Sequence, residues 1–268
     1  MKLILYSADD MAGKNIASLL RESHGFADSG KRAGLACWER DDMLLAEVDP
    51  SVLMLGSLDI GADIALVASR HRAESGMPAL TCHPTGNFAS ADIGGEPGTL
   101  QKTSSHYLRS AYMNLKRIAV ERDLPYEVTR EVTHHGPTGL PFPLVYVEVG
   151  SSPKQWGDMA AIAAATDAIL AMLSEPPKDT RSLIGFGGPH YAPNFNELAK
   201  EYAVGHIMPK YNADNASADM VAQMIELTDP VPDLAAIDWK GLTGRKRRAI
   251  IEAIESVGLE WKKTSELK

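Results

Sequence analysis

The chain has 268 residues, of which 44% are hydrophobic and 23% are charged, and its formal net charge is −8. This composition is ordinary for a globular protein with a sizeable core, and the negative charge argues against a surface covered with phosphate contacts, so any nucleic-acid site must be local. Cys37 and Cys82 are too few for a disulfide framework or a cysteine-rich zinc site, and we find no signal peptide or long apolar span, so we expect a soluble, cytoplasmic protein.

The N-terminal half of the sequence predicts a strand, a helix and then further strands. Residues 2–6 are apolar and lead into a helix in which Ile16, Leu19 and Leu20 keep helical spacing. Apolar runs predict more strands at 35–38, 43–48, 52–55, 63–69 and 78–82. A helix is predicted over 101–123, because its apolar residues recur along one stripe.

The C-terminal half continues the alternation. Strands are predicted at 126–132, 143–149, 182–186 and 204–207. Ser152 and Gln155 match a capping box that opens an Ala-rich helix to residue 173, Asn194 and Ser217 are expected helix caps, and the last helix begins near Thr243 and stops at Gly258. With no internal repeat or Ser/Gly linker, the pattern favours one three-layer α/β/α domain over 1–268 with a mixed central sheet.

Histidines beside Gly or Pro follow several of the predicted strands. The segments that contain them end apolar runs, and strand ends are where α/β proteins place ligands. Any one of these histidines could instead be structural, with its ring hydrogen-bonded to the backbone of a loop. Five such positions favour one polar pocket lined by His83, His134, His135, His190 and His206.

Glu148 is the carboxylate that the strand pattern places near these histidines. It shares a face with Tyr146 and Gly150, near the carboxyl end of its strand, and a buried strand rarely contains an unpartnered Glu. Glu131 alternates with Val132 and is ranked below Glu148 because it can face solvent. His24, His71 and His106 lack the Gly/Pro context and are interpreted as surface or packing residues, and Cys82 as a small buried hydrophobe.

Imidazoles and a carboxylate are the ligands of a catalytic Zn²⁺, which needs about three protein ligands and an open position. The ligands predicted here are His134, His135, Glu148 and His190. Their spacing matches no short zinc signature, so composition and position alone support the metal. Gly187 and Gly188 lack the spacing of a phosphate-binding loop, which argues against a nucleotide cofactor, and the absence of Gly-x-Ser-x-Gly argues against a serine esterase of the α/β-hydrolase kind.

The basic run Arg245, Lys246, Arg247 and Arg248 lies in the first turn of the last predicted helix, where the helix dipole disfavours positive charge. A docked RNA phosphate would stabilise it there. Pairing with nearby acidic side chains such as Glu252 or Glu255 explains the run equally well.

Six segments together resemble the archaeal and plant type of D-aminoacyl-tRNA deacylase. They are Leu5–Ile16 (LYSADDMAGKNI), Cys82–Phe88 (CHPTGNF), Glu131–Pro137 (EVTHHGP), Val147–Ser152 (VEVGSS) with Trp156, Gly185–Pro193 (GFGGPHYAP) and Gly205–Tyr211 (GHIMPKY). The resemblance spans almost the whole chain. It implies a monomeric or weakly associating cytosolic α/β hydrolase, related in fold to peptidyl-tRNA hydrolases and phosphorylase-like proteins, with zinc as cofactor. The implied reaction releases a D-amino acid from the 3′ end of tRNA.

The site residues can be assigned to this reaction as a hypothesis. Ester hydrolysis needs an activated water and a stabilised oxyanion. We expect His134, His135 and Glu148 to hold the metal or the water, and His83 or His190 to complete the site. Backbone near Gly86 or Gly187 would bind the oxyanion, and substrate contacts are expected from Gly86, Asn87, Gly187, Gly188, His206 and Lys210.

Two other functions remain open at this stage. A zinc-dependent peptidase or amidase would use the same pocket on small substrates without RNA. A nonenzymatic RNA-binding module would bind tRNA but cleave no ester.

Overall fold

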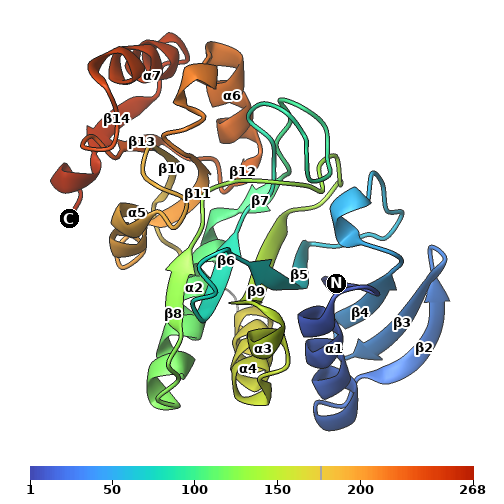
Figure 1. The fold of residues 1–268 in the computed structure, drawn as a ribbon. Coiled ribbons are helices and arrows are strands. Elements are labelled where there is room, and N and C mark those ends of the chain that lie inside the picture. Colours follow the sequence, from blue (N-terminus) through green and yellow to red (C-terminus); the bar gives the residue numbers. More distant parts are fainter. Residues whose placement is uncertain (176) are drawn as a thin grey trace.

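The computed structural model describes residues 1–175 and 177–268, and its strands form two main sheets (Figure 1). The larger sheet has eight strands in the order β2-β3-β4-β1-β5-β9-β6-β8. Its strands are β1 (Lys2–Ser7), β2 (Ala27–Arg32), β3 (Leu35–Arg40), β4 (Met43–Val48), β5 (Ile64–Arg72), β6 (Ala79–His83), β8 (Glu127–Arg130) and β9 (Leu144–Ser151). Strands β4, β1, β5 and β9 are parallel, while β9 pairs antiparallel with β6, so the sheet is mixed.

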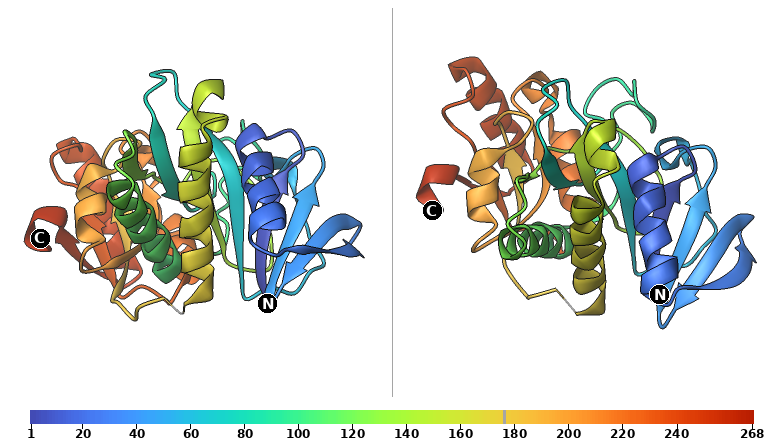
Figure 2. Two further views of the ribbon diagram at one scale, coloured as in Figure 1. Left: turned by 90° about the horizontal axis from the view of Figure 1, so that it is seen from below. Right: turned by 60° about the horizontal axis from the view of Figure 1, so that its bottom comes forward.

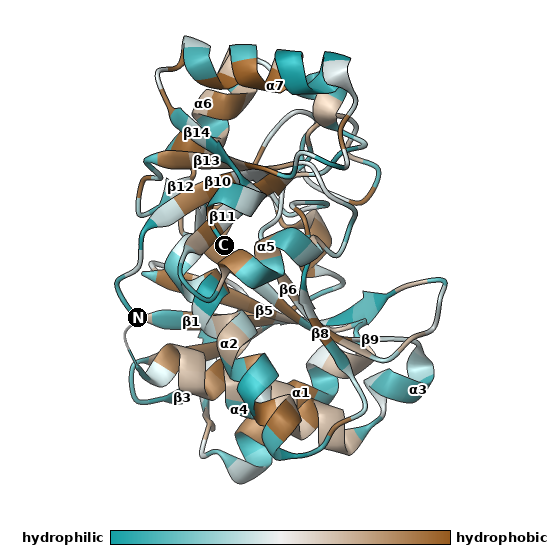
Figure 3. Cartoon of the chain, turned by 90° about the vertical axis from the view of Figure 1, so that its left-hand side faces the viewer, coloured by the Kyte–Doolittle hydropathy of each residue, from teal (hydrophilic) through white to brown (hydrophobic). Residues whose placement is uncertain are grey.

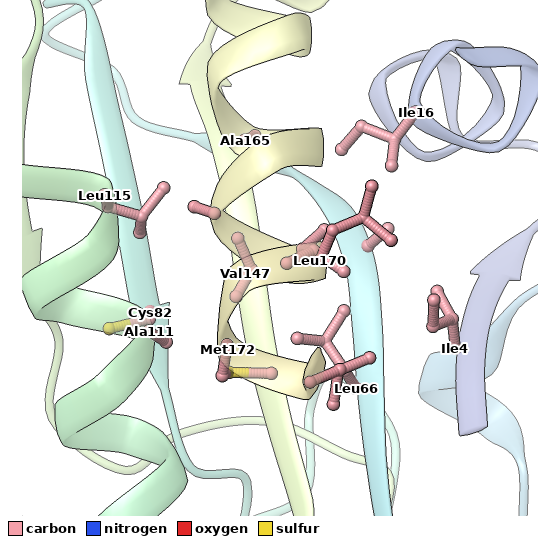
Figure 4. Packing of buried hydrophobic residues seen from close by; sticks show 14 of the residues in the cluster. Ile4, Ile16, Leu66, Cys82, Ala111, Leu115, Val147, Ala165, Leu170 and Met172 are labelled. Carbon is pink, nitrogen blue, oxygen red and sulfur yellow. The ribbon is translucent and has the colours of Figure 1, made fainter. Parts of the chain in front are cut away.

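Three helices cover one face of this sheet, as Figure 2 shows. They are α1 (Met11–Ser23), α2 (Ser105–Glu121) and α4 (Met159–Ser174). Helix α4 lies between the other two, and Figure 4 shows Ala165, Leu170 and Met172 packed toward Leu66 and Val147 of the sheet. The helix is apolar nearly all round because it contacts helices on both sides as well as strands.

The second sheet is entirely parallel and has the order β11-β10-β13-β14. Its strands are β10 (Ser182–Phe186), β11 (Ala203–Met208), β13 (Leu234–Ile237) and β14 (Glu260–Lys263). Helices α6 (Ala218–Glu226) and α7 (Gly244–Ser256) cover one face of it, and the short helix α5 (Pro193–Leu198) covers the other. In Figure 3 strands of both sheets, such as β5 and β13, are brown and hydrophobic, whereas α7 alternates between brown and teal. A two-stranded ladder of β7 (Thr103–Ser104) and β12 (Thr228–Asp229) lies between the sheets.

The predicted fold class is confirmed, since the chain is a mixed α/β protein with a large mixed sheet flanked by helices. Ser217 caps α6 as predicted. Helix α7 begins near Thr243 as predicted, with Thr243 as its cap, and Gly258 follows it with a φ of +75°. The division into two sheets was not predicted, nor was β2, whose residues are mostly exposed at a sheet edge. Among the described residues no helix has the length and apolarity needed to cross a membrane.

Three local predictions were wrong. Residues 52–54 form a 3-10 helix and no strand, because the side chains of Ser7 and Ser51 accept the N–H groups of Val52 and Leu53. The helix predicted from Ser152 is split into α3 (Pro153–Trp156) and α4, and Asp158 caps the second piece. Asn194 does not cap α5, because its side chain donates to Asp238.

Candidate functional site

Two buried carboxylates lie at the centre of the site, and a histidine lies between them. Glu148 comes from the middle of β9, and Glu131 follows the end of β8. His71, on β5, places Nδ1 3.0 Å from Glu131 Oε1 and 3.4 Å from Glu148 Oε2. The 3.0 Å contact is an ion pair without the alignment of a hydrogen bond. The side chains of His71 and Glu131 are only 4% and 0% exposed, so their charges can be buried only because they are paired.

The pairing fixes the charges of this centre. Burial by itself lowers the pKa of His71, but contacts with Glu131 and Glu148 outweigh it and raise that pKa to about 11. Burial by itself raises the pKa of Glu131, but the contact with His190 and the ion pair with His71 hold it well below its ordinary value. His71 is therefore an imidazolium at neutral pH, and Glu131 is a carboxylate.

Three further imidazoles lie close to the carboxylates. The Nδ1 atom of each contacts a backbone carbonyl. His83 Nδ1 is 3.2 Å from the carbonyl of Pro84, His134 Nδ1 is 2.8 Å from that of Val132, and His135 Nδ1 is 2.7 Å from that of Gly136. A carbonyl accepts only from N–H, so this arrangement assigns the proton to Nδ1 and leaves Nε2 as the free nitrogen of each ring.

The three rings are close enough that they cannot all carry charge. Ring centroids are 4.2 Å apart for His83 and His134, and 4.4 Å apart for His134 and His135. Burial and the neighbouring His83 lower the pKa of His135 to about 4, and the same causes hold that of His134 well below its ordinary value. The pKa of His83 is instead raised, because Glu148 outweighs burial. His134 and His135 are thus neutral near pH 7.

His190 connects the carboxylates to the second sheet. It follows β10, its Nε2 is 3.1 Å from Glu131 Oε2, and its Nδ1 is 3.2 Å from the hydroxyl of Tyr211. Backbone bonds hold this junction, because Val132 N–H donates to the carbonyl of His190 and Thr133 N–H to that of Ile207. The two sheets therefore contribute to one site.

Three cavities open around the cluster. The histidine cavity, of about 440 Å³, is lined by Asp10, Ser69, Tyr146, Glu148, Ile93 and four histidines. The Tyr211 cavity, of about 390 Å³, is lined by Gly86, Asn87, Ile93, Tyr211 and two of the same histidines, His134 and His135. The Tyr191 cavity, of about 590 Å³, is lined by His71, His190, Tyr191 and Asn196.

Potential metal-binding groups occur within the cluster. In each of three sets, one ligand atom per residue lies within 4.8 Å of the others. The sets are His83, His134 and His135; Glu131, His134 and His190; and His71, Glu131 and Glu148. The four ligands predicted from sequence, His134, His135, Glu148 and His190, do not fall into a single set. The set that contains both His134 and His135 is completed by His83, and it includes neither Glu148 nor His190.

The structure brings together His83, His134, His135, Glu148 and His190, with Gly86 and Asn87 at the edge of the Tyr211 cavity. His206 lies apart from the described cavities. It is fully buried, hydrogen-bonds Thr133, and burial lowers its pKa to about 4.

The glycine loops differ from the expected oxyanion site. The N–H of Gly86 donates to the carbonyl of His135, and the N–H of Gly187 donates to that of Met208. Both N–H groups are thus already used within the protein. Gly187 and Gly188 pack against Asp238, where a side chain on Gly187 would meet the Asp238 carbonyl at 2.8 Å.

The basic run on α7 is mostly engaged within the protein. Arg245 and Lys246 both pair with Asp214, at 2.6 and 3.1 Å, and Lys246 also donates to the carbonyl of Lys210. Arg247 lies over the Trp239 ring. Arg248 is exposed. The acidic partner is therefore Asp214, which the sequence did not single out.

Sequence reasoning underrated two residues at the centre of the site. His71 was interpreted as a surface or packing residue, but β5 runs past the expected end at residue 69 to Arg72 and carries His71 on the same face as Ser69. Glu131 was ranked low as a solvent-facing residue, yet it is fully buried. The period-two pattern extended beyond Ser69 was the available signal for His71.

Comparison with known proteins shows the family of this chain. The sequence profile of the family "D-aminoacyl-tRNA deacylase" matches residues 58–262. A relative of that name from Thermococcus kodakarensis is 32% identical over 97% of this chain and 99% of its own length. Another, from Methanocorpusculum labreanum, is 34% identical over 96% of this chain, and here the chain spans only 57% of the relative's length.

A solved structure has the same fold. It is titled as a conserved protein of unknown function, AF0625, and it is similar with a TM-score of 0.91 at 28% identity, covering 100% of this chain and 96% of that one. The profile match covers more than half of the chain, and full-length relatives exceed 30% identity. The chain belongs to the D-aminoacyl-tRNA deacylase family.

Proposed function

We propose that the cluster around Glu131 and Glu148 catalyses the hydrolysis of D-aminoacyl-tRNA to a free D-amino acid and tRNA, the reaction that the family's name describes. The observation that carries the proposal is the convergence of neutral and charged imidazoles on two buried carboxylates beside an open cavity. Perturbed titratable groups in a cavity are typical of catalytic sites. Because aminoacyl-tRNA is a substrate of protein synthesis, we also propose that the reaction takes place in the cytoplasm.

His134 is the best-placed proton acceptor. It is neutral, its side chain is 25% exposed, and it lines both the histidine cavity and the Tyr211 cavity. In the proposed step it takes a proton from water as the water oxygen bonds to the ester carbon. Glu131 Oε2, 3.4 Å from Nε2, stabilises the resulting imidazolium. The ester C–O bond then breaks, and the proton passes to the ribose oxygen of tRNA.

Tyr146 is the proposed oxyanion donor in place of the glycine loops. Tyr146 lines the histidine cavity, and its buried hydroxyl has no hydrogen-bond partner among the residues the structure describes. Burial raises its pKa well above the ordinary value, so it stays protonated and can donate.

The residues also fit a Zn²⁺ ion. His83, His134 and His135 each have Nδ1 anchored by a carbonyl, which is the second-shell arrangement that orients metal-ligating imidazoles, and His83 Nε2 is buried without a hydrogen-bond partner in the described chain. We propose these three as ligands in an alternative, zinc-bound state. In that state Nε2 of His134 would be occupied by the ion and would not accept a proton, and the bound zinc would supply Lewis acidity instead. Elemental analysis of wild type and His83→Ala tests the site, with loss of stoichiometric zinc expected in the variant.

The basic residues Arg245–Arg248 are proposed to contact the tRNA backbone outside the site. Because each phosphate contact releases counterions, KM for tRNA should rise between 50 and 200 mM salt. A small-substrate peptidase would show no such dependence.

The decisive assay compares D-tyrosyl-tRNA and L-tyrosyl-tRNA with the wild type and His134→Ala. We expect hydrolysis of the D ester, and a loss of about 10² to 10⁴-fold in kcat for the folded variant. Full activity in folded His134→Ala would exclude the role given to this residue. Tight tRNA binding without ester cleavage by the wild type would favour an RNA-binding module instead.

A further inference from the structure

We propose that the terminal adenine of the tRNA acceptor end binds in the Tyr211 cavity, with its ring stacked on Tyr211, while the aminoacyl group occupies the histidine cavity. This inference rests on the proposed function. It assigns the two halves of the substrate to opposite sides of His134 and His135.

His134 and His135 are shared by the two cavities. His134, His135 and Ile93 line both the histidine cavity and the Tyr211 cavity. An ester that reacts beside these rings has its acyl carbon at the boundary between the cavities. The acyl and ribosyl halves leave that carbon in different directions, so each cavity receives one half.

The Tyr211 cavity offers an exposed aromatic ring on which a base can stack. Tyr211 is 54% exposed at the Tyr211 cavity, whereas Tyr146, the aromatic side chain of the histidine cavity, is 1% exposed and offers no free face. The Tyr211 hydroxyl is 3.2 Å from His190 Nδ1, which holds the ring at the active site. Exposed aromatic rings of this kind are the usual stacking platforms for single-stranded nucleic acid.

The two cavities also differ in the charged side chains that line them. Asp9 and Glu148 line the histidine cavity and suit the ammonium group of an amino acid, although Arg70 and Arg72 line it as well. A third acid, Asp10, already accepts from the N–H groups of Gly13 and Arg70. Arg70 is directed to Asp9, donating to its carbonyl at 2.7 Å. The Tyr211 cavity contains one acid, the exposed Asp92, which accepts from Ser90. Lys210, next to Tyr211 in the chain, is exposed and can approach the phosphate that precedes the terminal adenosine.

The Tyr191 cavity is the rival location for the base. It is larger, and Tyr191 is only half-buried, but neither His134 nor His135 lines it. Adenine placed there would be separated from the shared histidines by His71 and His190.

The test uses Tyr211→Ala, Tyr211→Phe and Tyr191→Ala with D-tyrosyl-tRNA, and adenosine 5′-monophosphate as a competing probe. Tyr211→Ala should raise KM and the inhibition constant of the probe by roughly 10-fold or more, because one stacked base is lost. Tyr211→Phe keeps the ring and should restore both values to near wild type, even if loss of the His190 contact lowers kcat. Circular dichroism checks that each variant is folded.

Three results would overturn the assignment. Unchanged KM and probe inhibition in Tyr211→Ala would remove the stacking role. Equal losses in the Ala and Phe variants would assign the effect to the hydroxyl, and a loss confined to Tyr191→Ala would move the base to the Tyr191 cavity. If the wild type hydrolyses no D-aminoacyl-tRNA, the proposed function fails, and equilibrium dialysis of the monophosphate against the same variants still decides the location of the adenine.

Discussion

At the scale of single residues, His71 shows how burial gives a side chain a role that its neighbours in sequence do not suggest. It stands between two arginines, yet it is the cation that pairs with both Glu131 and Glu148. Two carboxylates buried this closely are tolerated only with such a partner.

Replacing His71 should therefore destabilise the fold as well as the site. We expect His71→Gln to lower the free energy of unfolding by about 3–5 kcal/mol, because it leaves uncompensated buried charge. Urea denaturation measures the change. His24→Gln is the matched control, since His24 is 3.8 Å from Asp167 at the surface and its loss should cost less than about 1 kcal/mol. Equal effects of the two substitutions would contradict the role of His71.

Cys82 gives a second prediction at this scale. It precedes His83 directly but points into the helix-covered face of the sheet, where burial raises its thiol pKa to about 12. The thiol stays protonated at all pH values below that and is shielded from reagents. Native protein at pH 8 should show no alkylation of Cys82 by iodoacetamide in peptide mass spectra, and urea-unfolded protein should show complete alkylation. Rapid modification of the native protein would contradict this placement.

At the scale of elements, the pairing of β5 with β9 positions the site. Gly150 lies opposite His71 in this ladder, and a Cβ at Gly150 would come within 2.6 Å of the Cβ and the carbonyl oxygen of His71. The absence of a side chain at this position is what allows His71 to reach the carboxylates.

A methyl group at position 150 should displace His71 from its place beside Glu131 and Glu148. Gly150→Ala is expected to lower kcat for D-tyrosyl-tRNA by roughly 10 to 100-fold, because sub-ångström to ångström misplacement of catalytic groups has effects of this size. Gly61→Ala is the control, since its Cβ would meet nothing within 4 Å. Steady-state kinetics of both variants decide the matter, and wild-type kcat in Gly150→Ala would refute it.

At the scale of the whole molecule, two sheets meet at the site. Helix α2 packs against strands of both, and backbone bonds of Val132 and Thr133 join the end of β8 to the second sheet. Arg130, fully buried, donates to the carbonyl of Val204 across the same junction. We propose on this basis that residues 1–268 fold as one domain.

A single domain predicts one cooperative unfolding transition. Trp239 and Trp261 stack beside the second sheet, while Trp38 and Trp156 pack against the core of the first. Tryptophan fluorescence of a Trp239→Phe, Trp261→Phe double variant reports the first sheet, and that of a Trp38→Phe, Trp156→Phe double variant reports the second. In each protein the fluorescence transition should coincide with that of far-UV circular dichroism in urea. Separate midpoints would show two independently unfolding units.

Local sequence patterns alone predicted the alternation of strands and helices, the helix cap at Ser217 and the loops that carry His83, His134, His135 and His190. These are local properties, since hydrophobic period, turn residues and caps are all read within a few positions. Strand alternation likewise identified Glu148.

Three features of the site depend on tertiary structure: the central position of His71 and Glu131, the separation of His206 from the cavities, and the use of the Gly86 and Gly187 N–H groups within the protein. The physical reason is that burial and pairing of charges depend on which strands become neighbours. His71 and Glu131 are 60 positions apart in sequence, and β5 and β8 are separated in the sheet by β9 and β6, so no local pattern contains their 3.0 Å contact.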